Sequence, residues 1–172
     1  MSLRTSLRTE ISESHLDPML HRGSPFEALS LFQDILSSGM FLRVRVTGRS
    51  MSPFLTGGEI IMIKKTPASC LRKGDLVFFK NLDGHPVIHR IVKKQKRGDD
   101  ITFQTRGDAL IGFDGPVREE EILGKVCVVE KGEEHYNLEA PHWRCANYLR
   151  AIINLYESRL YSRLSVFKKL LT

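Results

Sequence analysis

The chain has 172 residues, of which 41% are hydrophobic and 27% are charged. This length suits one domain with a real core, or a compact domain with a short appendage, and the balance excludes a disordered or low-complexity chain. The longest stretch free of Lys, Arg, Asp and Glu, residues 50–58, is far shorter than the roughly 20 apolar residues of a membrane-spanning helix. We therefore expect no transmembrane segment.

The net charge of +6 is unevenly distributed along the chain. Residues 142–172 contain six Lys or Arg residues and Glu157 as their one acid, so this segment carries most of the excess. A basic tail points to a local partner, such as an acidic protein, a nucleic acid end or an anionic membrane surface, whereas a uniformly basic surface would have suggested nucleic acid binding. We expect no nucleic acid partner.

Cysteine usage and the N-terminal composition suggest where the protein resides. Cys70, Cys127 and Cys145 form no CxxC pair, so neither a disulfide framework nor a zinc site is indicated. Residues 1–20 mix basic and acidic side chains without the apolar stretch of a secretory signal. The expectation is a cytoplasmic or peripherally membrane-associated protein with no metal, nucleotide or other cofactor.

The N-terminal part is predicted to be a flexible leader at residues 1–22 followed by a helix over 23–40. Ser24, Pro25 and Glu27 have the pattern of an N-cap, a first-turn proline and the acidic member of a capping box. Apolar residues then recur at helical spacing, namely Phe26, Leu29, Phe32, Ile35 and Leu36. Gly39 ends the predicted helix.

From residue 41 to 131 the pattern changes to short β-like runs separated by turn residues, which predicts a β-rich domain. The predicted strands are Leu42–Val46, Ile60–Ile63, Leu76–Phe79, Val87–Val92, Ile101–Gln104 and Ile122–Val129. The fold class is therefore mainly β (α+β), with a helix on either side of the β-domain.

Residues 142–172 are predicted to form a basic amphipathic helix. Apolar side chains fall three or four residues apart, at Leu149, Ile152, Ile153, Tyr156, Leu160, Leu164, Phe167 and Leu171. Three interpretations stay open: the helix packs on its own domain, docks a partner protein, or lies in a membrane interface.

Ser50 is the first candidate for chemistry. It follows a predicted strand and precedes the proline-restricted turn at Ser52-Pro53, where a side chain can be held exposed on a rigid scaffold. A serine hydroxyl becomes a nucleophile only when a base takes its proton. In a serine chosen blindly, support of a turn is the more common role.

His89 is the candidate base. Strand alternation places Val87, His89 and Ile91 on one face, with Arg90 on the other. A core histidine bonded to a backbone carbonyl is the structural alternative. For a carboxylate that orients the imidazole, Asp108 and Asp114 are both candidates, because each lies in the turn-rich loop after the strand at Ile101–Gln104.

Four ordered motifs resemble the signal peptidases of the S26 type within the S24/S26 serine peptidase group. They are Ser50-Met51-Ser52-Pro53-Phe54-Leu55 with Gly58-Glu59, then Gly74-Asp75-Leu76-Val77, then Ile88-His89-Arg90-Ile91, and finally Thr105-Arg106-Gly107-Asp108 followed by Asp114. The resemblance covers residues 44–130 and implies the β-fold of that group, with a peptide or precursor protein as substrate.

The resemblance also implies site roles. Histidine at position 89 is similar to the archaeal and endoplasmic-reticulum type (S26B), which uses Ser-His-Asp instead of a Ser-Lys dyad. It implies Ser50 as nucleophile, His89 as general base and Asp114 as the orienting acid, with Asp108 as the alternative acid. Met51, Pro53 and Phe54 are expected to contact substrate.

One departure from the family pattern concerns the oxyanion hole. The Ser50 backbone N–H is the expected first donor. Many relatives carry a serine two residues before the nucleophile, whereas this chain has Gly48, so Thr47 or a backbone amide is the candidate substitute. Arg49 is a further departure that places a cation beside the nucleophile.

We therefore expect a serine endopeptidase that cleaves a leader or signal-like peptide after small residues. The alternatives are a catalytically silent module that binds peptides or recruits partners, and a self-cleaving repressor-type domain. The lack of the dyad lysine and the short N-terminal helical segment argue against the repressor.

Overall fold

The computed structural model describes residues 25–170, and the side chains of residues 28–161. The predicted leader at residues 1–22 and the predicted N-cap at Ser24 lie outside the described residues. In the described part, the elements are α2 (Pro25–Ser37), β1 (Leu42–Arg45), β2 (Ile60–Lys64), β3 (Leu76–Lys80), β4 (Pro86–Arg97), β5 (Asp100–Arg106), β6 (Pro116–Arg118), β7 (Ile122–Lys131), β8 (Glu134–Asn137) and α3 (Pro141–Leu170). Short 3-10 turns lie at Ala68–Cys70 and Glu119–Glu121.

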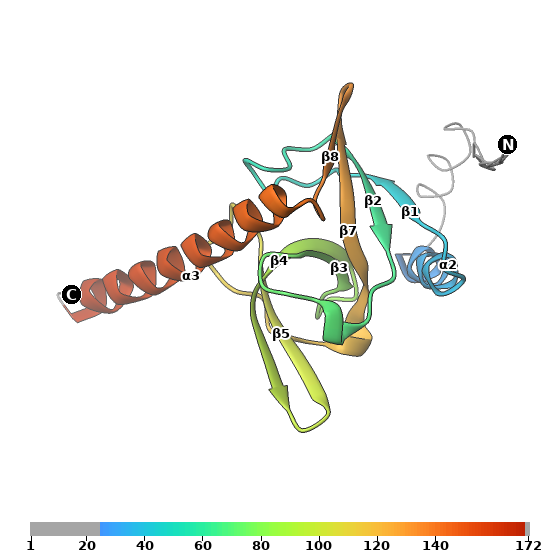
Figure 1. Ribbon diagram of the computed structural model, residues 1–172. Helices are drawn as coiled ribbons and strands as arrows, with labels where there is room; N and C mark the ends of the chain where they lie inside the picture. The colour runs from blue at the N-terminus through green and yellow to red at the C-terminus, as the bar shows by residue number, and fades with distance from the viewer. Residues whose placement is uncertain (1–24, 171–172) are drawn as a thin grey trace, which may run out of the picture.

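The strands form one antiparallel sheet with the order β1-β2-β7-β3-β4-β5-β6, and β8 pairs with β7 off this path. The sheet is strongly curled (Figure 1). The first six residues of β7 are all buried, and this part of the strand lies between β2 and β3, while its last residues pair with β8. The mainly β class with one helix before the sheet and one after it is confirmed.

Two strands were missed by the sequence prediction. Strand β6 has three residues and starts at Pro116, and strand β8 has the polar sequence Glu-His-Tyr-Asn. Neither has the apolar alternation that marks a strand, because both lie at the margin of the sheet. The predicted end of the β-domain at residue 131 therefore falls inside the β7–β8 hairpin, and the sheet continues to Asn137.

Helix α2 closes the larger of two buried apolar clusters. Leu29, Phe32 and Leu36 lie on one face of the helix and are buried against β1, β2 and β7, where the Phe32 ring contacts Phe78 of β3. This is the spacing that the sequence showed, and apolar burial is the force that holds this helix. The second cluster lies between β3, β4, β5 and β6.

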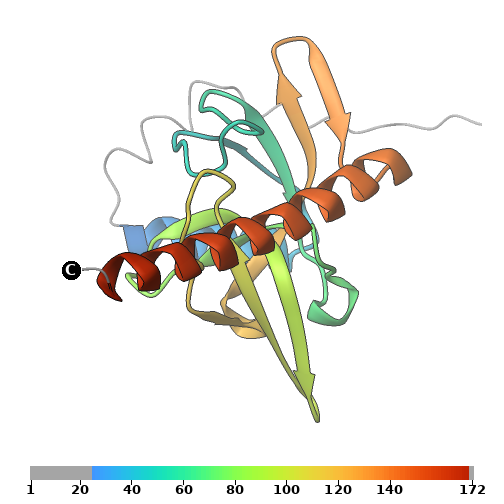
Figure 2. The same ribbon diagram turned by 90° about the vertical axis from the view of Figure 1, so that its left-hand side faces the viewer.

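Helix α3 crosses the outside of the sheet (Figure 2). Its buried side chains share one face, and most of them are polar: Asn147, Ala151, Asn154 and Ser158. Gly74 allows the close approach, because a Cβ built there would lie 2.8 Å from backbone atoms of Asn147 and Tyr148, and its φ is +98°. Neither helix in the described part is long and apolar enough to cross a bilayer.

Candidate functional site

Ser50 lies in a loop that leaves the sheet at Val46 and returns at Glu59. Backbone hydrogen bonds from Val46 N–H to Glu59 O (2.8 Å) and from Gly58 N–H to Val46 O (2.7 Å) close the ends of this loop. Met51 is buried beneath it in the α2 cluster. The Ser50 side chain is consequently left half-buried on a loop that is fixed at both ends.

The Glu59 carboxylate holds the returning end of the same loop. It accepts hydrogen bonds from Thr56 N–H, Thr56 Oγ1 and Gly57 N–H, at 2.8, 2.9 and 2.8 Å. Burial alone would raise the pKa of Glu59, but these hydrogen bonds outweigh it and lower the pKa from 4.5 to about 2. Glu59 is therefore a structural anion below the nucleophile candidate.

His89 lies in β4, opposite Val77 of β3, and its side chain is buried. The Phe79 ring contacts the imidazole edge, with 6.1 Å between the ring centroids. The ring is thus fixed on one side by an aromatic neighbour, and its two nitrogens have separate polar partners.

Those partners are Ser50 and Asp114. His89 Nε2 lies 3.1 Å from Ser50 Oγ, and His89 Nδ1 lies 2.7 Å from Asp114 Oδ2. The carboxylate can only accept when ionised, so Nδ1 carries the proton and Nε2 is left to accept from the Ser50 hydroxyl. The structure therefore brings Ser50, His89 and Asp114 into one hydrogen-bonded chain.

Thr105, in β5, fixes the carboxylate. Its hydroxyl donates to Asp114 Oδ2 at 2.7 Å, and its carbonyl accepts from Asp114 N–H at 2.9 Å. Thr105 is fully buried. Thr105 is the first residue of the Thr105-Arg106-Gly107-Asp108 motif, and no role for it was predicted from the sequence.

Gly107 is required where the loop passes the nucleophile. A Cβ at this position would lie 2.6 Å from the Ser50 carbonyl oxygen and 3.0 Å from His89 Nε2. The next residues also bind the Ser50 segment, since Ala109 N–H donates to Ser50 O at 2.9 Å. The same loop thus holds the backbone of Ser50 and carries Asp114.

Asp108, the alternative acid, faces a different partner. Its two carboxylate oxygens accept from Arg90 Nε and Nη2 at 2.8 and 2.7 Å, and both side chains are almost fully buried. Strand alternation explains why Asp108 and Asp114 have different partners, because Arg90 follows His89 in β4 and points to the opposite face of the sheet. Asp108 therefore pairs with the arginine behind the site, and the structure brings only Asp114 to the imidazole.

Helix α3 completes the back of this site, a contribution that the sequence prediction missed. Arg90 Nη1 donates to Asn147 Oδ1 at 2.8 Å, Asn154 Nδ2 donates to Asp108 Oδ1 at 2.8 Å, and Ser158 Oγ donates to the Ile111 carbonyl at 2.7 Å. All three contacts reach residues that neighbour the Ser50–His89–Asp114 chain.

Arg106 extends the same connection. It donates to the Leu110 carbonyl in the loop, and to the Asn154 carbonyl and Ser158 Oγ in α3. The residues joined by these contacts between α3 and the sheet are more than 40 residues apart in the sequence, so local periodicity could not predict the contacts. The available signal was the presence of Arg90 and Arg106 inside β-strands, since a buried arginine needs several acceptors.

The residues expected to contact substrate differ in their exposure. Pro53 is exposed, and Phe54 is half-buried against the Trp143 ring of α3, with ring centroids 5.8 Å apart. Met51 is only 2% exposed and packs in the core, so of these three side chains it is the least accessible to a substrate. Thr47 and Arg49 both lie exposed on the Ser50 loop.

No group of three or more His, Cys, Asp and Glu side chains in the described residues is placed to hold a metal ion. The chemistry that the site itself offers is proton transfer between Ser50 and His89, with Asp114 able to stabilise an imidazolium.

Comparisons with known proteins agree on one group. A model of the Peptidase S24-like family matches residues 24–127, more than half of the chain. Signal peptidase I W of Bacillus subtilis (strain 168) is 37% identical over 79 residues, which are 45% of this chain and 42% of that protein. The matched family segment contains Ser50, His89 and Asp114 but not α3.

Proposed function

This chain belongs to the Peptidase S24-like family, and on that premise we propose that it is a serine endopeptidase in which Ser50, His89 and Asp114 act as a catalytic triad. The observation that carries the proposal is the hydrogen-bonded chain from Ser50 Oγ through both nitrogens of His89 to Asp114 Oδ2. A nucleophile, a base and an orienting acid in this order are the arrangement that acyl transfer requires.

The mechanism follows from the proton positions. His89 Nε2 removes the Ser50 proton as Oγ attacks a peptide carbonyl, and Asp114 stabilises the imidazolium that forms. The imidazolium then gives its proton to the leaving amine, and water releases the acyl group by the same route. Thr105 and the Phe79 ring keep the carboxylate and the imidazole in place during both steps.

The oxyanion that develops needs a hydrogen-bond donor, and we assign this role to the Ser50 backbone N–H. Thr47 is the candidate for a second donor, because it lies exposed on the same loop. Removing an oxyanion donor typically costs about 2.7–4 kcal/mol of barrier. Thr47→Val should therefore lower kcat by about a hundredfold or more.

We propose an extended leader or signal-like peptide, cleaved after small residues, as the substrate. Support comes from the likeness to signal peptidase I W and from the histidine at position 89, which is the residue expected of the Ser-His-Asp type. The exposed Pro53 and the half-buried Phe54 lie beside the nucleophile on its loop, where an extended peptide would pass.

Turnover of a peptide library with signal-like sequences tests this function. We expect Ser50→Ala and His89→Ala to lower kcat/KM at least about a thousandfold, because the triad acts as a unit. Asp114→Asn should lower kcat by about 10⁴-fold, since the imidazole loses its orienting acceptor. A folded wild-type chain that binds these peptides without cleaving any would instead establish a silent binding module.

Asp108→Asn is the matched control for the acid. This substitution weakens the Arg90 pair behind the site and leaves the Asp114 contact to His89 in place. The folded Asp108→Asn protein should retain far more kcat than Asp114→Asn. The reverse order would move the orienting role to Asp108.

A further inference from the structure

The face of α3 that points away from the sheet carries a row of exposed apolar side chains, which we call the outer stripe. It consists of Leu149, Ile153, Tyr156 and Leu160, which are 53%, 46%, 68% and 62% exposed. Figure 2 looks onto the outer side of this helix, where no other element of the described chain covers it. Side chains three and four residues apart share one face, so the stripe is continuous.

Packing on the protein's own sheet does not account for this stripe. The opposite face of α3 meets the sheet, and its asparagine and serine side chains bond to Arg90, Asp108 and Arg106. An amphipathic helix normally buries its apolar face. In α3 the two faces are reversed, which leaves a contiguous apolar surface without a partner.

Positive charge accompanies the stripe. Arg159 is exposed on α3 and has no carboxylate within 4 Å among the described residues. Lys73 lies over the Tyr148 ring, 5.7 Å from its centroid, at one flank of the helix. The sequence adds Arg163, Lys168 and Lys169 towards the end of α3.

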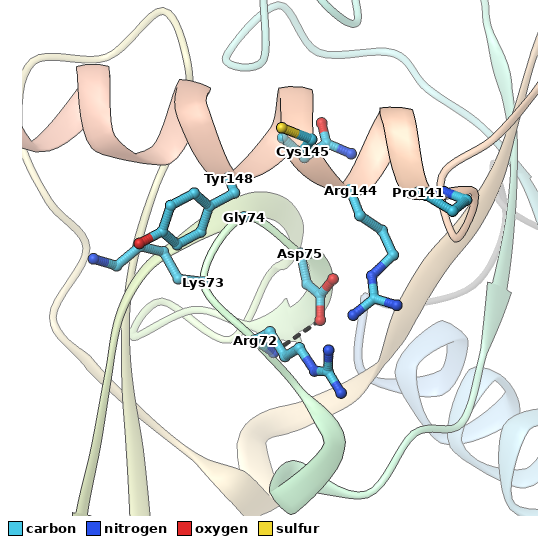
Figure 3. A pocket seen from close by; sticks show the side chains of 9 residues that line it. Arg72, Lys73, Gly74, Asp75, Pro141, Arg144, Cys145 and Tyr148 are labelled. Atoms are coloured by element: carbon cyan, nitrogen blue, oxygen red, sulfur yellow. Dashed lines mark hydrogen bonds between the residues drawn. The ribbon is translucent and has the colours of Figure 1, made fainter.

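Positively charged side chains also lie near the start of α3. A pocket of about 440 Å³ lies between the loop before β3 and the first turns of the helix. Figure 3 shows Arg72 and Arg144 extending into this space, near Asp75. Asp75 is already paired with Lys125 at 2.9 Å, so the pocket keeps an excess of positive charge.

From these observations we propose that the outer stripe of α3 docks on an anionic lipid bilayer. A basic helix with an apolar face lies in the plane of a membrane interface, where each Lys or Arg near the surface adds to the attraction for anionic lipid. Tyr156 suits this depth, because its ring is apolar and its hydroxyl can reach water. Pairing with a second copy is disfavoured, because it would bring two strongly basic helices together.

The loop that carries Asp114 contacts the face of α3 opposite the outer stripe. Ser158 of α3 is bonded to the Ile111 carbonyl, and Leu110, Ile111 and Phe113 are exposed apolar side chains in the loop that carries Asp114. The docking proposal rests on the outer stripe and on the positive charge around α3, and it does not depend on the peptidase activity.

Vesicle flotation tests the proposal with the full chain. We expect the protein to float with phosphatidylglycerol–phosphatidylcholine vesicles and to stay in solution with phosphatidylcholine alone, and we expect salt to weaken binding. Ile153→Glu combined with Leu160→Glu should weaken binding at least about tenfold, because it removes two apolar side chains that would enter the bilayer and adds charge of the same sign as the lipid.

Leu31→Glu is the matched control, since Leu31 is an exposed apolar residue of α2 with 42% exposure. It should float like the wild type, and circular dichroism should show that all variants are folded. Failure of the wild type to float, or equal flotation of the α3 variant, would overturn the proposal. So would sedimentation showing a dimer that the α3 substitutions dissociate, because the stripe would then be a self-interface.

Discussion

The two helices have similar apolar periodicity in the sequence and opposite orientations in the structure. Helix α2 buries Leu29, Phe32 and Leu36 in the core. Helix α3 buries Asn147, Asn154 and Ser158 and exposes its apolar row. Periodicity therefore identifies a helix without saying which face points inward. That choice depends on what the sheet offers, which is an apolar surface under α2 and two arginines under α3.

The largest effect should come from the core face of α2. Phe32→Ala removes a buried ring that contacts Phe78, and we expect it to lower the free energy of unfolding by about 3–5 kcal/mol. On α3, Tyr156→Ala should change it by no more than about 0.5 kcal/mol, because that ring is exposed. Urea denaturation of both variants measures the difference. Similar losses would contradict the reversed orientation of α3.

A smaller loss in the free energy of unfolding should follow from a substitution that pushes α3 away from the sheet. Gly74→Ala places a Cβ 2.8 Å from the α3 backbone, at a φ of +98° that a side chain adopts only with strain. We expect a loss of about 1–3 kcal/mol. Hydrogen exchange should show weaker protection of residues 141–158, with α2 unchanged. Unchanged protection of α3 would mean that the contact at Gly74 does not hold the helix.

A polar substitution on the inner face should act on the site as well as on stability. Asn154→Leu leaves Asp108 without one hydrogen bond and should cost about 1–3 kcal/mol. Because Asp108 lies in the loop that leads to Asp114, kcat should fall and KM should change little. Arg159→Leu, on an exposed position of the same helix, is the control. Equal kcat for both variants would show that the inner face of α3 does not affect the site.

A further expected effect is a pH dependence that α2 cannot produce, because its buried contacts are uncharged. The pKa of Glu59 is about 2 in the folded protein and 4.5 unperturbed, so its contribution to stability is complete above pH 4.5 and is lost as the pH falls towards 2. Thermal unfolding between pH 5 and 2 should show a steeper decline for the wild type than for Glu59→Gln. If the thermal stability of both proteins declined in parallel, groups other than Glu59 would cause the acid sensitivity.

Much of the fold could be predicted from the sequence, because glycine-rich turns separate apolar runs of strand length. All six predicted strands overlap strands of the sheet. The short, polar strands β6 and β8 were not found, since their pairing comes from neighbours that are distant in sequence and not from their own alternation.

Part of the candidate site could also be predicted from the sequence. Position and residue type singled out Ser50 and His89, while local reasoning left Asp108 and Asp114 as equal candidates. Arg90 could have separated them, because a buried arginine beside His89 on the opposite strand face needs its own carboxylate. The contacts of Asn147 and Asn154 could not be predicted, because they depend on where α3 crosses the sheet.

Covalent labelling with a fluorophosphonate probe, followed by mass spectrometry of the modified peptide, tests the catalytic triad most directly. We expect one labelled residue, Ser50, and loss of that label in His89→Ala while the protein stays folded. A folded wild-type chain that resists the probe, or a Ser50→Ala chain that is labelled equally, would contradict it.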